Sequence, residues 1–112
     1  YVGKNNRQND ALTLRADGEQ MWLHVKNIPG SHVVIDQKGE PGEATLYAAA
    51  QLAAYYSKAR QSASVPVDYT PRRFVKKPSG ARAGMVVYST NKTLYITPDE
   101  SYIKGLKREE TT

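Results

Sequence analysis

Residues 21–35, MWLHVKNIPGSHVVI, contain two short apolar runs on either side of a Pro-Gly turn. Residues 21–26 alternate and are rich in strand-forming side chains, and residues 31–35 form a second run of this kind. The four residues between them suit a tight turn, because proline presets one dihedral angle and glycine tolerates the next. A connection of this length favours an antiparallel hairpin, so we expect this segment to begin a β-sheet.

Two registers of this hairpin are open, and they place the polar side chains differently. Pairing Lys26 with Ser31 sets His24 and His32 on opposite faces of the sheet. A shift of one residue, which a bulge at the turn permits, brings both histidines to one face together with Trp22. We favour the shifted register because it gathers the polar motif on one side. The apolar residues that it leaves for the core are Leu23, Val25, Val33 and Ile35.

The single tryptophan has two interpretations. Trp22 and His24 lie two residues apart on a strand and therefore face the same side. If the opposite face is the core, the two rings form an exposed aromatic platform suited to stacking on a base. The alternative is that Trp22 is the largest core residue and that His24 is a hydrogen-bonded side chain.

Beyond the hairpin, the clearest helix is expected over residues 43–60. A shorter helix or turn is expected around residues 11–14, with Asn9 and Asp10 as capping residues. The apolar face of the long helix recurs at spacings of three and four and is small enough to approach a sheet closely. This face consists of Leu46, Ala49, Ala50, Ala53 and Tyr56.

Three further strands are expected at residues 65–69, 85–89 and 93–97, the last two forming a hairpin. The sum is an α+β fold, a mostly antiparallel β-sheet with one long helix packed against it. We expect one domain over residues 1–99 and a polar, fraying C-terminal tail over residues 100–112.

Composition narrows the class of protein. The 112 residues carry a net charge of +5 and contain no cysteine, which excludes disulfides and thiolate metal sites. There is no run of 18 apolar residues and no segment that resembles a signal peptide, so no membrane insertion is expected. These features fit a reducing cytoplasm, although many surface proteins also lack cysteine.

Basic residues are concentrated between positions 58 and 82, where Asp68 is the only acid. Such a segment attracts polyanions, and the alternative is a surface that serves solubility. The ribbon at 72–77 and the glycine-rich loop that follows it predict sequence-independent phosphate contacts. The residues expected to make them are Arg72, Arg73, Lys76, Lys77 and Arg82.

Polar residues near the start of the chain form a second candidate set. Lys4 and Arg7 suit phosphates, whereas Asn5 and Asn9 suit bases, sugars or backbone. The alternative for Asn9 is a structural cap. Ser31 and His32, after the Pro-Gly turn, would offer backbone N–H groups and an imidazole to a phosphate or ribose, unless the turn only orients the second strand.

Catalytic and metal chemistry find little support. His24 and His32 lack the third ligand that a zinc site needs. No Gly-x-Ser-x-Gly elbow is present, and Ser31 next to His32 is not the geometry of a triad. We therefore expect no enzyme activity, no metal and no cofactor.

The order of the motifs resembles the NFACT-R domain, the C-terminal RNA-binding module of the fibronectin-binding protein A family, which includes ribosome quality-control factors. The resemblance covers residues 1–99, and a short strand that the family has before Gly3 is missing, so we expect a fragment of a longer protein. The matching motifs include GKN at 3–5, QND at 8–10, WLH at 22–24, IPGSHV at 28–33, AAYYSKAR at 53–60, VDYT at 67–70 and KKP at 76–78.

This resemblance implies RNA binding, with tRNA and the ribosomal RNA of the large ribosomal subunit as partners, in the cytoplasm. It also implies an alternative, because the same family was named for binding fibronectin. In that case the domain would act as an adhesin exposed at the bacterial cell surface.

Overall fold

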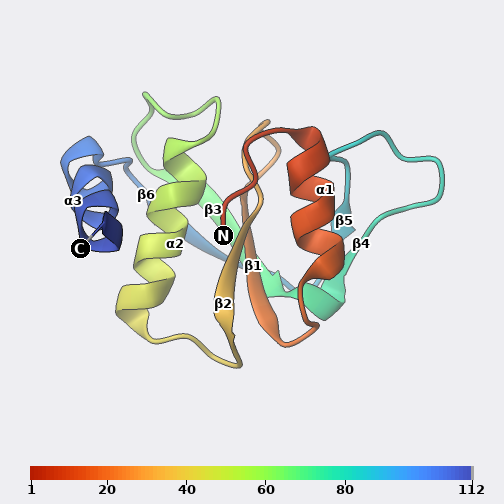
Figure 1. The fold of residues 1–112 in the computed structure, drawn as a ribbon. Helices are drawn as coiled ribbons and strands as arrows, with labels where there is room; N and C mark the ends of the chain where they lie inside the picture. Colours follow the sequence, from red (N-terminus) through yellow and green to blue (C-terminus); the bar gives the residue numbers. More distant parts are fainter. Residues whose placement is uncertain (112) are drawn as a thin grey trace.

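The computed structural model describes the backbone of residues 1–111 and the side chains of residues 1–106. Its centre is a four-stranded antiparallel sheet in the order β2-β1-β3-β6 (Figure 1). These strands are β1 (Gln20–Val25), β2 (Val33–Lys38), β3 (Val65–Pro71) and β6 (Lys92–Ile96). A smaller sheet pairs β4 (Val75–Lys76) with β5 (Val87–Tyr88). The α+β class and the antiparallel sheet are confirmed.

Three α-helices surround the sheet, where the sequence predicted one long helix and a short helix or turn around residues 11–14. They are α1 (Asn6–Arg15), α2 (Glu43–Tyr55) and α3 (Glu100–Thr111), with a 3-10 turn, η1 (Arg72–Phe74), between β3 and β4. In Figure 1, α2 and α1 lie on opposite sides of the central strands. Both faces of the sheet are therefore covered, and each has its own core.

The core under α2 contains the four residues predicted from alternation, Leu23, Val25, Val33 and Ile35. The helix meets them with buried alanines, Ala49, Ala50, Ala53 and Ala54, which let it approach the sheet closely. The core on the other face is built from Trp22, Val34 and Val75.

The hairpin has the shifted register. Trp22 pairs with Val34 and Leu23 with Val33, and the pattern is interrupted by a bulge between Gln20 and Trp22. His24 and His32 consequently lie on the same face, with ring centroids 5.2 Å apart. The prediction that this register collects both histidines beside Trp22 is confirmed.

The prediction of an exposed aromatic platform is wrong. Trp22 is fully buried, with an exposed fraction of 0%. Leu12 of α1 and Ala16, the residue that follows this helix, pack over it together with Val75 and Tyr88 of the small sheet. The alternative interpretation, that Trp22 is the largest core residue, is confirmed, because elements distant in sequence cover this face of the sheet.

The helix boundaries differ from the expected ones for identifiable reasons. Helix α1 begins at Asn6, and its cap is Asn5, whose side chain accepts the Gln8 N–H at 2.8 Å. Helix α2 ends at Tyr55 instead of residue 60. Ser57 Oγ donates a hydrogen bond at 2.7 Å to the carbonyl of Ala54, one of the last carbonyls of α2. This bond provides a partner for a carbonyl that has none within the helix, and the chain leaves the helical path there.

The second half of the chain contains two corrections. Strands β5 and β6 do not form a hairpin, because β5 pairs with β4 and β6 pairs with β3. Residues 100–111, expected as a fraying tail, form α3. Within residues 100–106 of this helix Ile103 is buried, with 1% exposed, and α3 packs against α2.

Candidate functional site

A buried polar network holds α1 against the hairpin. Trp22 Nε1 donates to Thr13 Oγ1 at 3.0 Å, and the same hydroxyl lies 2.8 Å from His32 Nδ1. Asn9 accepts the His32 N–H at 2.9 Å and donates to the Gly30 carbonyl at 3.2 Å. These side chains are buried and use their polar groups internally, so their roles are structural.

Burial keeps both histidines neutral. The pKa of His32 is lowered to about 4, chiefly by loss of solvation and also by the neighbouring His24, while Asp10 opposes the shift. Burial also lowers the pKa of His24, partly offset by the Gly30 backbone. With Thr13 accepting from the tryptophan, its hydroxyl proton is available to Nδ1 of a neutral His32.

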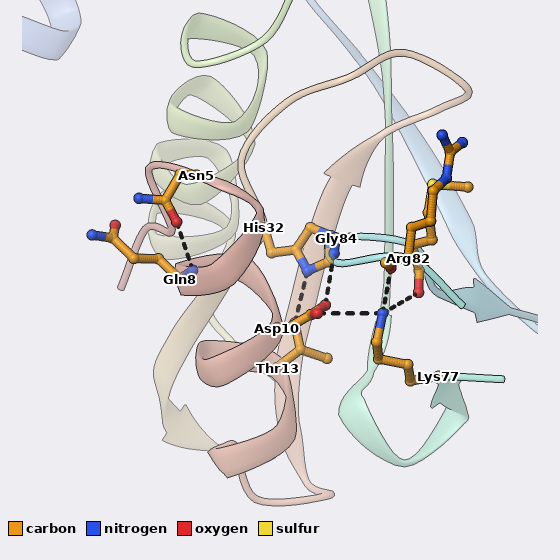
Figure 2. A network of polar contacts seen from close by, with 9 residues as sticks. Asn5, Gln8, Asp10, Thr13, His32, Lys77, Arg82 and Gly84 are labelled. Atoms are coloured by element: carbon orange, nitrogen blue, oxygen red, sulfur yellow. Dashed lines mark hydrogen bonds and ion pairs between the residues drawn. The ribbon is translucent and has the colours of Figure 1, made fainter. Parts of the chain in front are cut away.

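The glycine-rich loop between β4 and β5 is fastened to α1 through Lys77, as Figure 2 shows. The Lys77 ammonium lies 3.3 Å from the Asp10 carboxylate. It also donates to the carbonyl oxygens of Arg82 at 2.6 Å and Met85 at 3.1 Å. Asp10 accepts the Gly84 N–H at 3.0 Å. We call this set of contacts the loop clamp.

Glycine is required where the loop meets the helix. Gly84 has a φ of +84°, which L side chains rarely adopt, and a Cβ there would lie 2.5 Å from Asn6 Oδ1. The loop therefore approaches the first turn of α1 closely and with a defined backbone path.

The basic ribbon predicted at residues 72–77 does not act as one surface. The Arg72 guanidinium donates to the carbonyls of Thr13 and Val75, and Lys77 belongs to the loop clamp. Arg73 and Lys76 are exposed, and the Arg73 backbone is bonded to Gly18. Two of the four cations thus stabilise the fold, and two face solvent.

A cleft of about 380 Å³ opens between the start of α1 and the end of α2, and we call it the tyrosine cleft. The Lys4 ammonium lies 4.4 Å from the centre of the Tyr56 ring. The Arg60 guanidinium lies 3.8 Å from that of Tyr55 and is 3.9 Å from the Glu100 carboxylate. Cations held against tyrosine faces give this cleft both charge and stacking surface. Its lining includes Lys4, Asn5, Tyr55, Tyr56, Lys58 and Arg60.

A larger cleft of about 560 Å³ opens between the β1–β2 turn and the glycine-rich loop, and we call it the histidine cleft. It shares Asn6, Pro29 and Gly30 with the tyrosine cleft, so the two lie on either side of the Pro-Gly turn. Gly30 lies close against the turn that follows α2, since a Cβ there would lie 2.8 Å from Ser57 Cβ. The residues that give it its character are His24, Ile28, Arg82, Met85, Val86 and Tyr88.

Charge is separated between the two ends of the domain. The start of α1 and the end of α2 lie at the upper end in Figure 1, and residues 16–19 and 36–42 lie at the lower end. Within residues 1–106, the exposed Lys4, Arg7, Lys58 and Arg82 form no ion pair. The acids in or next to the lower loops are Asp17, Glu19, Asp36, Glu40 and Glu43.

The predicted site residues differ in exposure and in their distance from the two clefts. Lys4, Asn5 and Arg82 are exposed and line the two clefts, and His24 is half-buried in one of them. Arg7 is exposed in the first turn of α1 and lines neither cleft. Buried are Asn9, Trp22, Ser31 and His32. Local sequence patterns do not group Tyr55, Tyr56, Lys58 and Arg60 into one site, because their YYSKAR run is typical of the end of a helix.

A small α+β domain with a basic end and two adjoining clefts fits the class of nucleic-acid-binding modules. In residues 1–106 no group of three histidine, aspartate or glutamate side chains could hold a metal ion, and no described helix is long and apolar enough to cross a membrane. Residues 1–90 match the family described as NFACT protein RNA binding domain, and the chain belongs to this family.

Relatives support this assignment. The chain is 56% identical over 108 residues to the Rqc2 homolog RqcH of Bacillus subtilis (strain 168), covering 96% of this chain and 19% of that protein. It is 46% identical over 109 residues to the Rqc2 homolog RqcH of Streptococcus pneumoniae (strain ATCC BAA-255 / R6), covering 96% and 20%. The chain thus spans about a fifth of the length of these relatives.

A solved structure and a more distant relative extend the comparison. The C-terminal part of the fibronectin/fibrinogen-binding protein from Streptococcus suis superposes with a TM-score of 0.90 at 48% identity, covering 93% of this chain and 42% of that one. Coiled-coil domain-containing protein 25 of Mus musculus is 29% identical over 119 residues, covering 100% of this chain and 57% of that protein.

Proposed function

We propose that this domain binds tRNA or the ribosomal RNA of the large subunit through its basic end, as the RNA-binding module of a ribosome-associated quality-control factor. The observation that carries the proposal is the charge separation between the two ends. Within residues 1–106, Lys4, Lys58 and Arg82 line the two clefts and form no ion pair. Five of the seven exposed acids in that part of the chain lie in or next to the loops at the far end, and the other two are Asp99 and Glu100 at the start of α3. The RNA-binding family and the RqcH names of the relatives support the choice of RNA.

The chemistry expected of this end is binding without catalysis. Lys4, Lys58 and Arg82 suit phosphate oxygens, and the tyrosine faces of the first cleft suit ribose or base stacking. The cytoplasm is the compartment in which such a domain would meet ribosomes and tRNA.

A second candidate comes from the name of the streptococcal structure, which includes fibronectin and fibrinogen binding. In that role the domain would act as an adhesin at the bacterial cell surface. An interface of that kind built on strand addition depends on backbone hydrogen bonds and is only weakly sensitive to salt. RNA binding through phosphates weakens steeply with salt.

Two charge-matched double variants test the proposal. Lys4→Glu with Lys58→Glu changes the basic end, and Arg73→Glu with Lys92→Glu changes two exposed cations elsewhere. Each substitution alters the charge by −2, so both variants go from +5 to +1. Binding to tRNA, to a large-subunit rRNA fragment and to fibronectin is measured by fluorescence anisotropy at 50 and 200 mM salt.

We expect the first variant to lose at least about tenfold in RNA affinity. The dependence of its affinity on salt concentration should also fall by the amount expected for about two lost phosphate contacts. The second variant should change much less in both respects. Equal loss in both variants would show that only net charge matters and would reject the basic end as the site. Salt-insensitive binding to fibronectin, with no RNA binding, would support the adhesin.

A further inference from the structure

The histidine cleft differs in chemistry from the rest of the basic end. Resting on the proposed RNA binding, we propose that this cleft receives one unstacked nucleobase of a single-stranded RNA segment, while Arg82 at its rim contacts the adjoining phosphate. The cleft's volume of about 560 Å³ lies within the range of sites that enclose small ligands.

The walls of the cleft are apolar and partly exposed. Ile28 and Val86 line it, and Met85 lines it with 52% of its surface exposed. A methionine thioether is flexible and polarizable and packs well against aromatic faces. Such walls are suited to a flat, weakly polar ring and are poorly suited to a phosphate.

The aromatic side of the cleft is fixed in place from behind. The His24 ring stacks on buried Trp22 at 5.9 Å and meets His32 edge-on at 5.2 Å. Tyr88, which also lines the cleft, lies 5.0 Å from Trp22, and its hydroxyl donates to Asp68. These rings are already ordered, so a base entering the cleft meets a surface that needs no rearrangement.

The protonation state of His24 also favours a nucleobase as the occupant of the cleft. The lowered pKa of His24 leaves its imidazole neutral at neutral pH. A neutral imidazole offers one donor and one acceptor, which matches the mixed edge of a nucleobase, whereas a protonated one would attract phosphate. The cation of this cleft is Arg82, at the rim.

The loop clamp holds Arg82 in position. Lys77 bonds the Arg82 carbonyl, and Asp10 holds both Lys77 and the Gly84 N–H, so the loop backbone on both sides of the arginine is tied to α1. In Figure 2 the Arg82 side chain extends away from this contact, leaving the guanidinium available to a ligand. A phosphate contact there is consistent with a base in the cleft beside it.

The test uses the 112-residue chain and labelled RNA pentamers that differ by one abasic nucleotide. An abasic site removes the base and keeps every phosphate, so the electrostatic part of binding stays constant. We expect one position at which the abasic pentamer binds about 5- to 150-fold more weakly, as expected for one stacked base. Emission of Trp22, the only tryptophan, should change with the intact pentamer and change less with that abasic pentamer.

Two exposed variants and a control locate the effect. Met85→Ala should reduce the difference between intact and abasic pentamers, and Arg82→Ala should weaken both pentamers equally and flatten the salt slope. Val87→Ala is the matched control, since Val87 is 55% exposed and does not line the cleft.

The failures of the two proposals are distinguishable. If pentamers bind but every abasic pentamer binds like the intact one, or Met85→Ala leaves their difference unchanged, the base site is rejected and the basic end stands. If neither pentamers nor folded RNAs bind at any salt concentration, the proposed function itself is rejected.

Discussion

The Lys77 ammonium lies 3.3 Å from the Asp10 carboxylate and joins the glycine-rich loop to α1. Lys38 and Asp17 lie at the same distance at the far end of the domain. The pairs differ in exposure: the side chains are 21% and 17% exposed in the first, and 62% and 43% in the second. Their energetic contributions should therefore differ.

The first prediction compares these two ion pairs. Asp10→Asn should lower the free energy of unfolding by about 1–3 kcal/mol, because it leaves a half-buried ammonium without its counter-charge. Lys38→Gln removes a solvent-screened pair and should change it by less than about 1 kcal/mol. Urea unfolding measures both, and hydrogen exchange at the Gly84 N–H should accelerate in Asp10→Asn. Equal effects would show that the loop clamp does not stabilise the fold.

The second prediction concerns two buried threonines. Thr13→Val leaves the Trp22 N–H and a His32 ring nitrogen without their shared partner and should cost about 1–3 kcal/mol. Thr70 is also buried, but its hydroxyl has no hydrogen-bond partner within residues 1–106. Thr70→Val should therefore be neutral or stabilising. Thermal and urea unfolding measure the stability of both variants. A large loss of unfolding free energy in Thr70→Val would contradict the prediction and indicate a water bound to that hydroxyl.

The third prediction is a loss of stability in acid. In the unfolded chain His32 takes up a proton near its ordinary pKa of 6.5, whereas in the folded state it does so only near 4. The stabilisation is complete above pH 6.5 and is lost as pH falls from 6.5 to about 4, by on the order of 3 kcal/mol. His24 acts in the same direction. The free energy of unfolding, measured between pH 4 and 8, should depend less on pH in His32→Gln than in the original protein.

The fourth prediction separates the two adjacent arginines of the basic ribbon. Arg72→Ala should destabilise the domain by about 1–3 kcal/mol, because it removes bonds to the Thr13 and Val75 carbonyls. Arg73→Ala, at an exposed position where the guanidinium lies 4.9 Å from the Phe74 ring centre, should stay within about 1 kcal/mol. Replacing the whole ribbon therefore does not isolate RNA contacts. Thermal unfolding followed by circular dichroism measures the stability of the two variants and should precede any binding assay.

Local patterns in the sequence were enough to predict the hairpin, its register and the core beneath α2. Alternation identifies Leu23 and Val25 as one face and Trp22 and His24 as the other, whatever lies elsewhere in the chain. It does not say whether the second face is covered. That depends on Val75 and Tyr88, whose approach to Trp22 is set by long-range packing.

The same limit explains the errors at the candidate site. Lys77 resembles a phosphate ligand in sequence, but its partner Asp10 lies in α1, and Asp10 also bonds Gly84, 74 residues away. The tyrosine cleft joins Lys4 to Tyr56, a contact that no local pattern encodes. Charge and composition predicted a basic surface, and tertiary structure decided which cations remain available on it.

The opposite charges at the two ends of the domain act before any contact is made. Near a polyanion, a body with one positive and one negative end experiences a torque, so it tends to approach with its positive end leading. At physiological salt this field extends about 8 Å, so the rotation takes place in the final stage of diffusion. The acidic loops would therefore raise the fraction of collisions that begin in a productive orientation, and their neutralisation would slow association while leaving the lifetime of the complex nearly unchanged.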